Sequence, residues 1–156
     1  MLIAFLDWIA DSRIVAFVRT DRVAYATING AHILGISLLV GAIVNSDLRT
    51  AGLWKAGRWR EGLETCVPVA AVGLALAIVT GAVLFSVRGE HYLSDSAFLI
   101  KVSLVAAGLV NVLVFRRVMA RRAGDVPSTT MGLSAISSLA IWIGAIFAGR
   151  WIAFME

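Results

Sequence analysis

The sequence predicts an all-α integral membrane protein, a four-helix bundle preceded by an interfacial amphipathic helix. Of its 156 residues, 60% are hydrophobic and 15% are charged, and the mean hydropathy is +0.88. A soluble domain usually carries about 25% charged residues. Apolar runs of about 20 residues, the length needed to cross a bilayer as a helix, recur along the chain. We expect a single membrane domain over residues 1–156.

Individual residues in the last three predicted spans have expected structural roles. Pro68 suits the first turn of the second span, and Asp95 is placed to cap the N-terminus of the third. Asn111, inside the third span, is expected to hydrogen-bond a neighbouring helix, whereas Trp142, near the middle of the fourth, is expected to pack. The four spans cover residues 24–44, 67–87, 97–115 and 133–154.

Residues 1–22 form an interfacial segment in this interpretation. Asp7, Asp11 and Arg13 interrupt the early apolar residues, so no charge-free run is long enough to span. Trp8 is expected at headgroup depth, as in helices that lie in the interface. No basic region precedes the apolar residues, so we do not expect a cleaved secretory signal.

Basic residues gather in the loops between the spans. Tryptophans accompany them at Trp54 and Trp59, which is typical of membrane-interface anchors and speaks against a nucleic-acid surface. By the positive-inside rule the more basic side is cytoplasmic, which predicts a multi-pass protein of the bacterial inner membrane with both termini periplasmic. The first and third interspan loops hold Arg49, Lys55, Arg58, Arg60, Arg116, Arg117, Arg121 and Arg122, against Arg13, Arg19, Arg22 and Arg88 on the opposite side.

His32 is the chief candidate for a functional residue, because an imidazole inside a span is costly unless it is used. It lies ~12 Å inside the outer end of the first span at 1.5 Å per residue. Asn29 precedes it by one helical turn. Lys101 and Arg150 enter their spans from the same side, and His91 belongs to the loop above them.

Two cofactors fit this set. In the first, His32 is an axial ligand of a b-type haem, His91 ligates the opposite side, and Lys101 and Arg150 pair with the propionates. Electrons would then pass from a quinol in the bilayer to an outer acceptor. In the second, His32, His91 and Met155 bind a metal ion such as copper. Taken singly, each residue also has a structural explanation: His32 as a hydrogen-bonded packing residue, and the bases as side chains that reach the headgroups.

Several stretches together resemble a family of uncharacterised bacterial four-helix membrane proteins, a domain of unknown function. They are HILGISLLVGAIVNSDLRTAGL, TGAVLF, SAFLIK and WIGAIFAGRWIAF. The resemblance covers nearly the whole chain and implies an inner-membrane location and no particular reaction. More distantly, the bundle is similar to b-type cytochromes and copper-resistance membrane proteins. The family pattern often has an acidic residue at the position of Asn29 and a histidine at that of Arg116, so a second haem ligand here would have to be His91.

The alternative to a haem protein is a non-catalytic accessory or scaffold subunit. Gly73, Ala77 and Gly81 recur at four-residue spacing, and such small-residue faces let transmembrane helices approach closely. These faces are more abundant than a four-helix bundle needs, which favours a homo-oligomer or a larger membrane complex. The sequence contains no nucleophile elbow, phosphate-binding glycine loop or HExxH motif, so hydrolase and nucleotide chemistry have no support, and enzymatic activity stays an open question.

Overall fold

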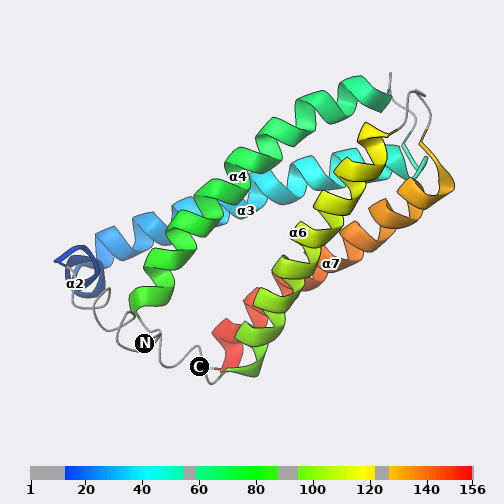
Figure 1. Ribbon diagram of the computed structural model, residues 1–156. Coiled ribbons are helices and arrows are strands. Elements are labelled where there is room, and N and C mark those ends of the chain that lie inside the picture. The colour runs from blue at the N-terminus through cyan, green and yellow to red at the C-terminus, as the bar shows by residue number, and fades with distance from the viewer. Residues whose placement is uncertain (1–12, 55–58, 88–94, 122–126, 156) are drawn as a thin grey trace. The chain divides into compact units, whose positions relative to one another are not determined.

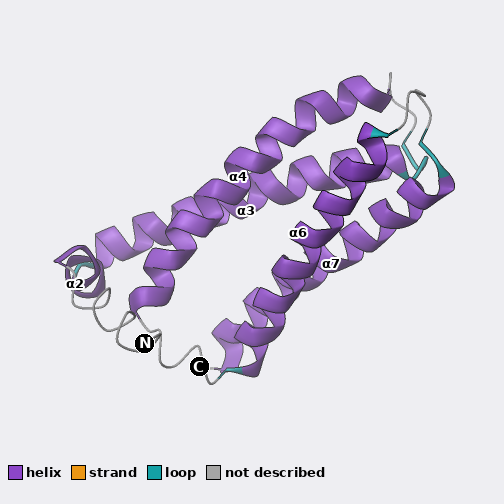
Figure 2. Ribbon diagram, viewed as in Figure 1, coloured by secondary structure: helices purple, strands orange, loops and turns teal. Residues whose placement is uncertain are grey.

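The protein is all-α, as predicted, in the residues that the computed structural model describes: 13–54, 59–87, 95–121 and 127–155. Helices alternate with loops there, and no strand occurs within those ranges (Figures 1 and 2). Four of the helices are long and apolar enough to cross a membrane. The helices are α2 (Arg13–Thr20), α3 (Arg22–Thr50), α4 (Trp59–Val87), α6 (Ser96–Ala120) and α7 (Thr129–Met155). Trp8 and the other residues of 1–12 lie outside the described part.

Helix α3 runs past the predicted end of the first span, through Thr50. Its last turns are polar but bond within the helix: Arg49 Nε donates to Asn45 Oδ1 at 2.9 Å, and Thr50 Oγ1 donates to the Ser46 carbonyl at 2.8 Å. The helix stops where Gly52 adopts φ +74°, a left-handed conformation that glycine enters without steric cost. The segment expected to be a loop is therefore helical up to this turn.

Pro68 lies inside α4 and not in its first turn, so this prediction was wrong. The helix begins at Trp59, nine residues earlier. Polar residues before the apolar run continue the helix, and Thr65 Oγ1 donates to the Glu61 carbonyl at 3.1 Å. A proline removes one backbone donor, and membrane helices tolerate it when neighbouring groups satisfy the freed carbonyl.

Side-chain caps fix three helix starts. Asp21 Oδ1 accepts from the backbone N–H groups of Val23 at 2.8 Å and Ala24 at 2.9 Å, at the start of α3. Asp95 caps α6, as predicted, by accepting from the Ala97 N–H at 2.9 Å. Ser128 Oγ accepts from Met131 N at the start of α7. Each cap satisfies donors that a helix N-terminus otherwise leaves without a partner.

The chain divides into two compact units. Unit 1 comprises Met1–Leu39 and Ala71–Ser94, and unit 2 comprises Val40–Ala70 and Asp95–Glu156. In unit 1, α2 is amphipathic: Val15 and Val18 are buried, whereas Phe17 is exposed. This pattern agrees with the short amphipathic helix predicted near the N-terminus.

Glycines bring the backbones of α3 and α4 into direct contact within unit 1. A Cβ atom added to Gly35 would lie 2.7 Å from Ala77 N and 2.9 Å from the Gly73 carbonyl oxygen. A Cβ added to Gly73 would lie 2.5 Å from Leu39 N. The small-residue face predicted on the second span is therefore a helix-packing face in unit 1.

In unit 2, α6 and α7 lie side by side along their length (Figure 1). The buried α7 residues recur every three or four positions from Met131 to Ala145, and Ile152 follows two turns later, as one face of a helix requires. Trp142 fills the space above Gly108, where an added Cβ would lie 2.8 Å from the indole Cζ2. The tryptophan therefore packs, as predicted. The buried α7 residues are Met131, Ala135, Ser138, Trp142, Ala145 and Ile152.

Asn111 links α6 to α7, which confirms its predicted role. Its Nδ2 donates to the Ser134 carbonyl at 3.1 Å, and Ser134 Oγ donates to Asn111 Oδ1 at 2.7 Å. The two bonds satisfy the amide of Asn111 from a single partner residue. Such pairs supply the hydrogen bonds that water would supply outside the bilayer.

The Gly35→Ala substitution should destabilise the protein by about 1–3 kcal/mol, because the added methyl group meets backbone atoms that cannot rotate away. Thermal unfolding of the full chain in detergent measures the loss. Gly30→Ala is the matched control on the same helix, since nothing lies within 4 Å of its added Cβ. Alanine is the better helix former, so this control should be neutral or slightly stabilising; equal losses in both variants would contradict the close packing.

Asn111 and Ser134 should show a coupling free energy of about 0.6–1.7 kcal/mol in a double-mutant cycle, the range measured for polar pairs between transmembrane helices. The cycle compares Asn111→Leu, Ser134→Ala and the double variant by unfolding in detergent. Ser37→Ala replaces Ser134→Ala in a control cycle, because the Ser37 hydroxyl donates to the Ile33 carbonyl of its own helix. Additive losses in the first cycle would refute the link.

Candidate functional site

His32 is held between α3 and α4 in unit 1 and is half-buried there. Its Nδ1 lies 3.1 Å from Thr80 Oγ1. The Thr80 hydroxyl donates to the Leu76 carbonyl one turn earlier in α4, and Thr80 itself is buried. The imidazole is therefore joined to the backbone of the facing helix through one hydroxyl.

This chain of bonds decides which imidazole nitrogen carries the proton. A hydroxyl has one hydrogen, and that of Thr80 is directed at the Leu76 carbonyl. Thr80 Oγ1 can then only accept from His32, so Nδ1 is the donor. In the neutral imidazole the lone pair falls on Nε2. Histidines that bind metals commonly have this arrangement, in which the second nitrogen donates to a fixed acceptor.

Gly81 makes room for the ring. A Cβ added at Gly81 would lie 2.9 Å from His32 Cε1 and 3.4 Å from Nδ1. The imidazole therefore lies directly against the backbone of α4. Any larger residue at position 81 would displace the ring from Thr80.

The other predicted site residues divide between the two units. Asn29 is exposed on α3, one turn before His32 in unit 1. His91 lies outside the described residues. Lys101 and Arg150 belong to unit 2, where the side chain of Lys101 crosses Gly149: an added Cβ there would lie 3.3 Å from Lys101 Cε. Lys101 thus packs beside the residue that precedes Arg150 in α7.

Among the described residues, no group of three or more His, Cys, Asp or Glu side chains is placed to hold a metal ion. The predicted metal site of His32, His91 and Met155 requires one residue outside those ranges. It therefore stays a prediction.

Two polar groups in unit 2 were not singled out as site residues from the sequence. The Asp47 carboxylate is hydrogen-bonded by Ser138 of α7, and no base pairs with it in the described part of the chain. Within that part, Asp47 Oδ2 and Trp142 Nε1 are buried without a hydrogen-bond partner. An acidic residue directly after the first apolar run was the signal that the sequence offered.

Asn45 provides a second polar contact in unit 2. Its Oδ1 accepts from Arg49 Nε at 2.9 Å and from the Cys66 thiol of α4 at 3.6 Å. Arg49 in turn lies against Gly62, where an added Cβ would be 2.9 Å from its guanidinium. Cys66 is thus a packing residue of the α3–α4 contact in unit 2.

Four long apolar helices and interhelical polar pairs define a multi-pass helical membrane protein. The model of a family of unknown function, DUF6644, matches residues 5–155, and the chain belongs to this family. No curated protein and no solved structure matches the chain. The family resemblance inferred from the sequence is confirmed.

Replacing Thr80 by valine should remove the hydrogen bond from His32 Nδ1, because a methyl group cannot accept it. The imidazole proton is then no longer held on Nδ1. In ¹⁵N NMR spectra of the histidine side chains, we expect the wild type to show the Nδ1–H form and Thr80→Val a mixture of tautomers. Thr80→Ser restores the hydroxyl and should restore the wild-type spectrum. Identical spectra for the wild type and the valine variant would contradict the assigned tautomer.

Proposed function

We propose that this protein is a small membrane cytochrome that binds a b-type haem through His32 Nε2 and accepts electrons from a quinol in the bilayer. Haem iron would supply the one-electron chemistry, and the chain would supply the ligand and its orientation. Unit 1 alone carries the argument.

The hydrogen bond between His32 and Thr80 is the observation that supports this proposal. It directs the Nδ1 proton at a buried hydroxyl, and in this tautomer Nε2 is the nitrogen with the chemistry of a ligand. A packing histidine needs only some partner, whereas an axial ligand needs a fixed ring plane and tautomer. Thr80 fixes the tautomer, and contact with Gly81 fixes the ring.

The remaining residues have defined parts in the proposal. His91, which lies outside the described residues, is the proposed second axial ligand. Exposed Asn29 lies one turn from His32, where the amide can hydrogen-bond a bound group.

The test is a reduced-minus-oxidised absorption spectrum of the full chain purified from haem-replete cells. We expect Soret and alpha bands of a b-type haem, lost in His32→Ala and retained in Thr80→Val with a shifted midpoint potential. A change in potential is expected because the Nδ1 hydrogen bond tunes the basicity of the ligand.

Folding and ligation are separated by two controls. Circular dichroism shows whether His32→Ala stays helical, and His32→Gly with added imidazole should regain the bands if only the ligand was lost. His91→Ala should convert a six-coordinate spectrum to a five-coordinate one. Wild-type protein without bands after haem reconstitution would remove the proposal.

The accessory-subunit alternative rests on small-residue helix faces, and several of their glycines pack inside the chain. Gly35, Gly73 and Gly81 contact α3 or α4 within unit 1, and Gly108 and Gly149 contact side chains within unit 2. These five glycines therefore pack within the chain, and an outside partner stays the alternative proposal.

A further inference from the structure

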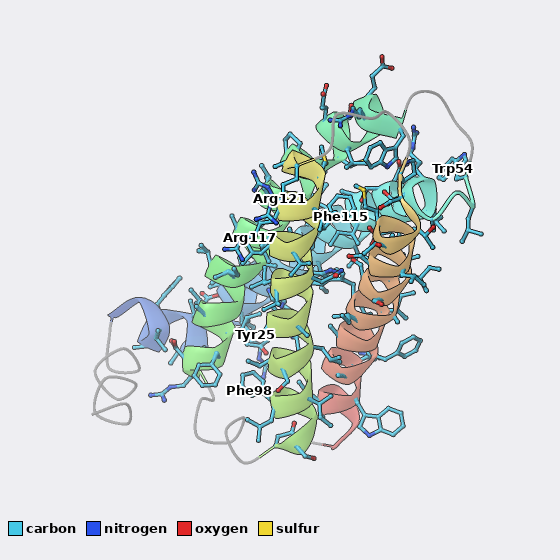
Figure 3. The ribbon with its side chains drawn as sticks, turned by 45° about the vertical axis from the view of Figure 1, so that its right-hand side comes forward. Tyr25, Trp54, Phe98, Phe115, Arg117 and Arg121 are labelled. Carbon is cyan, nitrogen blue, oxygen red and sulfur yellow. The ribbon has the colours of Figure 1, made fainter. Side chains whose placement is uncertain are left out.

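A pair of arginines distinguishes the C-terminal end of α6. Arg117 lies in the last turn of this helix and Arg121 is its C-cap residue. Both are exposed, and both project from the same side of α6, one turn apart (Figure 3). Side chains four positions apart on a helix have Cβ atoms about 5–6 Å apart, so two guanidinium groups can reach one tetrahedral anion.

Neither base has an acidic neighbour on its own helix. From Ser96 to Ala120 the helix contains no Asp or Glu. Neither Arg117 nor Arg121 forms an ion pair within the described ranges. Arg60 of the same unit differs, because its guanidinium lies over the Trp59 ring at 5.7 Å. The pair on α6 is therefore the more available for an outside anion.

The depth of the pair identifies the source of the anion. The mainly apolar part of α6, Ala97 to Phe115, rises about 28 Å, which matches the hydrocarbon core of about 30 Å. Arg117 then lies ~3 Å and Arg121 ~9 Å beyond the last apolar residue. The headgroup layer is about 5–8 Å thick on each side, so the two bases bracket the level of the lipid phosphates.

We propose that Arg117 and Arg121 form a binding site for the headgroup phosphate of an acidic phospholipid. The planar guanidinium matches phosphate oxygens through paired hydrogen bonds, which a lysine ammonium cannot supply. A zwitterionic lipid carries its own cation beside the phosphate, so it gains less from two arginines. Arg116, also exposed, adds positive charge on the adjacent face of the helix.

Lipid titration of the full chain in detergent tests this site, with bound lipid counted by native mass spectrometry. We expect dioleoylphosphatidylglycerol to bind more tightly than dioleoylphosphatidylcholine. Each arginine near an anionic lipid surface contributes about fivefold in affinity. Arg117→Gln and Arg121→Gln should each weaken phosphatidylglycerol binding about fivefold, and the double variant ~25-fold. Binding of phosphatidylcholine should change little.

The matched control is Arg19→Gln with Arg22→Gln, which removes the same charge from two exposed positions in unit 1. This control should keep the preference for phosphatidylglycerol. If it loses as much affinity as the double variant of Arg117 and Arg121, the effect is one of net charge, and the proposed site is overturned. Equal binding of the two lipids by the wild type would also overturn it. Inorganic phosphate in excess should not displace the lipid; displacement would mean a free-anion site.

Folding is checked by circular dichroism of every variant. If the double glutamine variant loses helicity, the two single variants decide, and unchanged affinity in both overturns the proposal. Arg117→Lys with Arg121→Lys keeps the charge and removes the bidentate geometry, so we expect an intermediate loss.

Discussion

Polar groups inside a bilayer must find partners within the protein, and this constraint organises the described helices. Hydrocarbon offers no water, so an unsatisfied polar group costs several kcal/mol. His32 is satisfied by Thr80, and Asn111 by Ser134. The hydroxyls of Thr27, Ser37 and Ser86 donate back to their own helices. Each of these side chains therefore either joins two helices or bonds the helix that carries it, whereas Asp47 Oδ2 and Trp142 Nε1 are exceptions within the described part of the chain.

Glycine is what allows such short polar links. Hydroxyl and imidazole side chains are small compared with the usual 8–10 Å between helix axes. At Gly35 and Gly73 the backbones touch, and at Gly81 the imidazole lies on the backbone itself. In unit 1, the faces of α3 and α4 that carry these glycines also carry His32 and Thr80. The close approach of the two helices and the His32–Thr80 hydrogen bond therefore occur together. In unit 2 the same combination recurs, with Trp142 over Gly108 near the Asn111–Ser134 pair.

The proposed haem ligand and the proposed lipid site differ in what partners their polar groups. One partner is inside the protein and the other is the lipid headgroup layer. His32 sits within the apolar layer, where a fixed partner sets its protonation pattern. Arg117 and Arg121 stand at the end of α6, where their charge is met by the headgroups outside the protein. The position of a polar residue along its helix therefore decides whether its partner is another side chain or a lipid headgroup.

The sequence by itself determined the helical class, the four spans, the cap at Asp95 and the helix link at Asn111, because hydropathy and local capping chemistry depend on neighbours along the chain. It also singled out His32 as an imidazole within a span. Only the tertiary structure decided that Thr80 is its partner and Nδ1 its donor, since residues 48 positions apart meet through packing. The long α4 with Pro68 inside it was likewise decided by structure, because a proline fits either the first turn or the interior of a membrane helix.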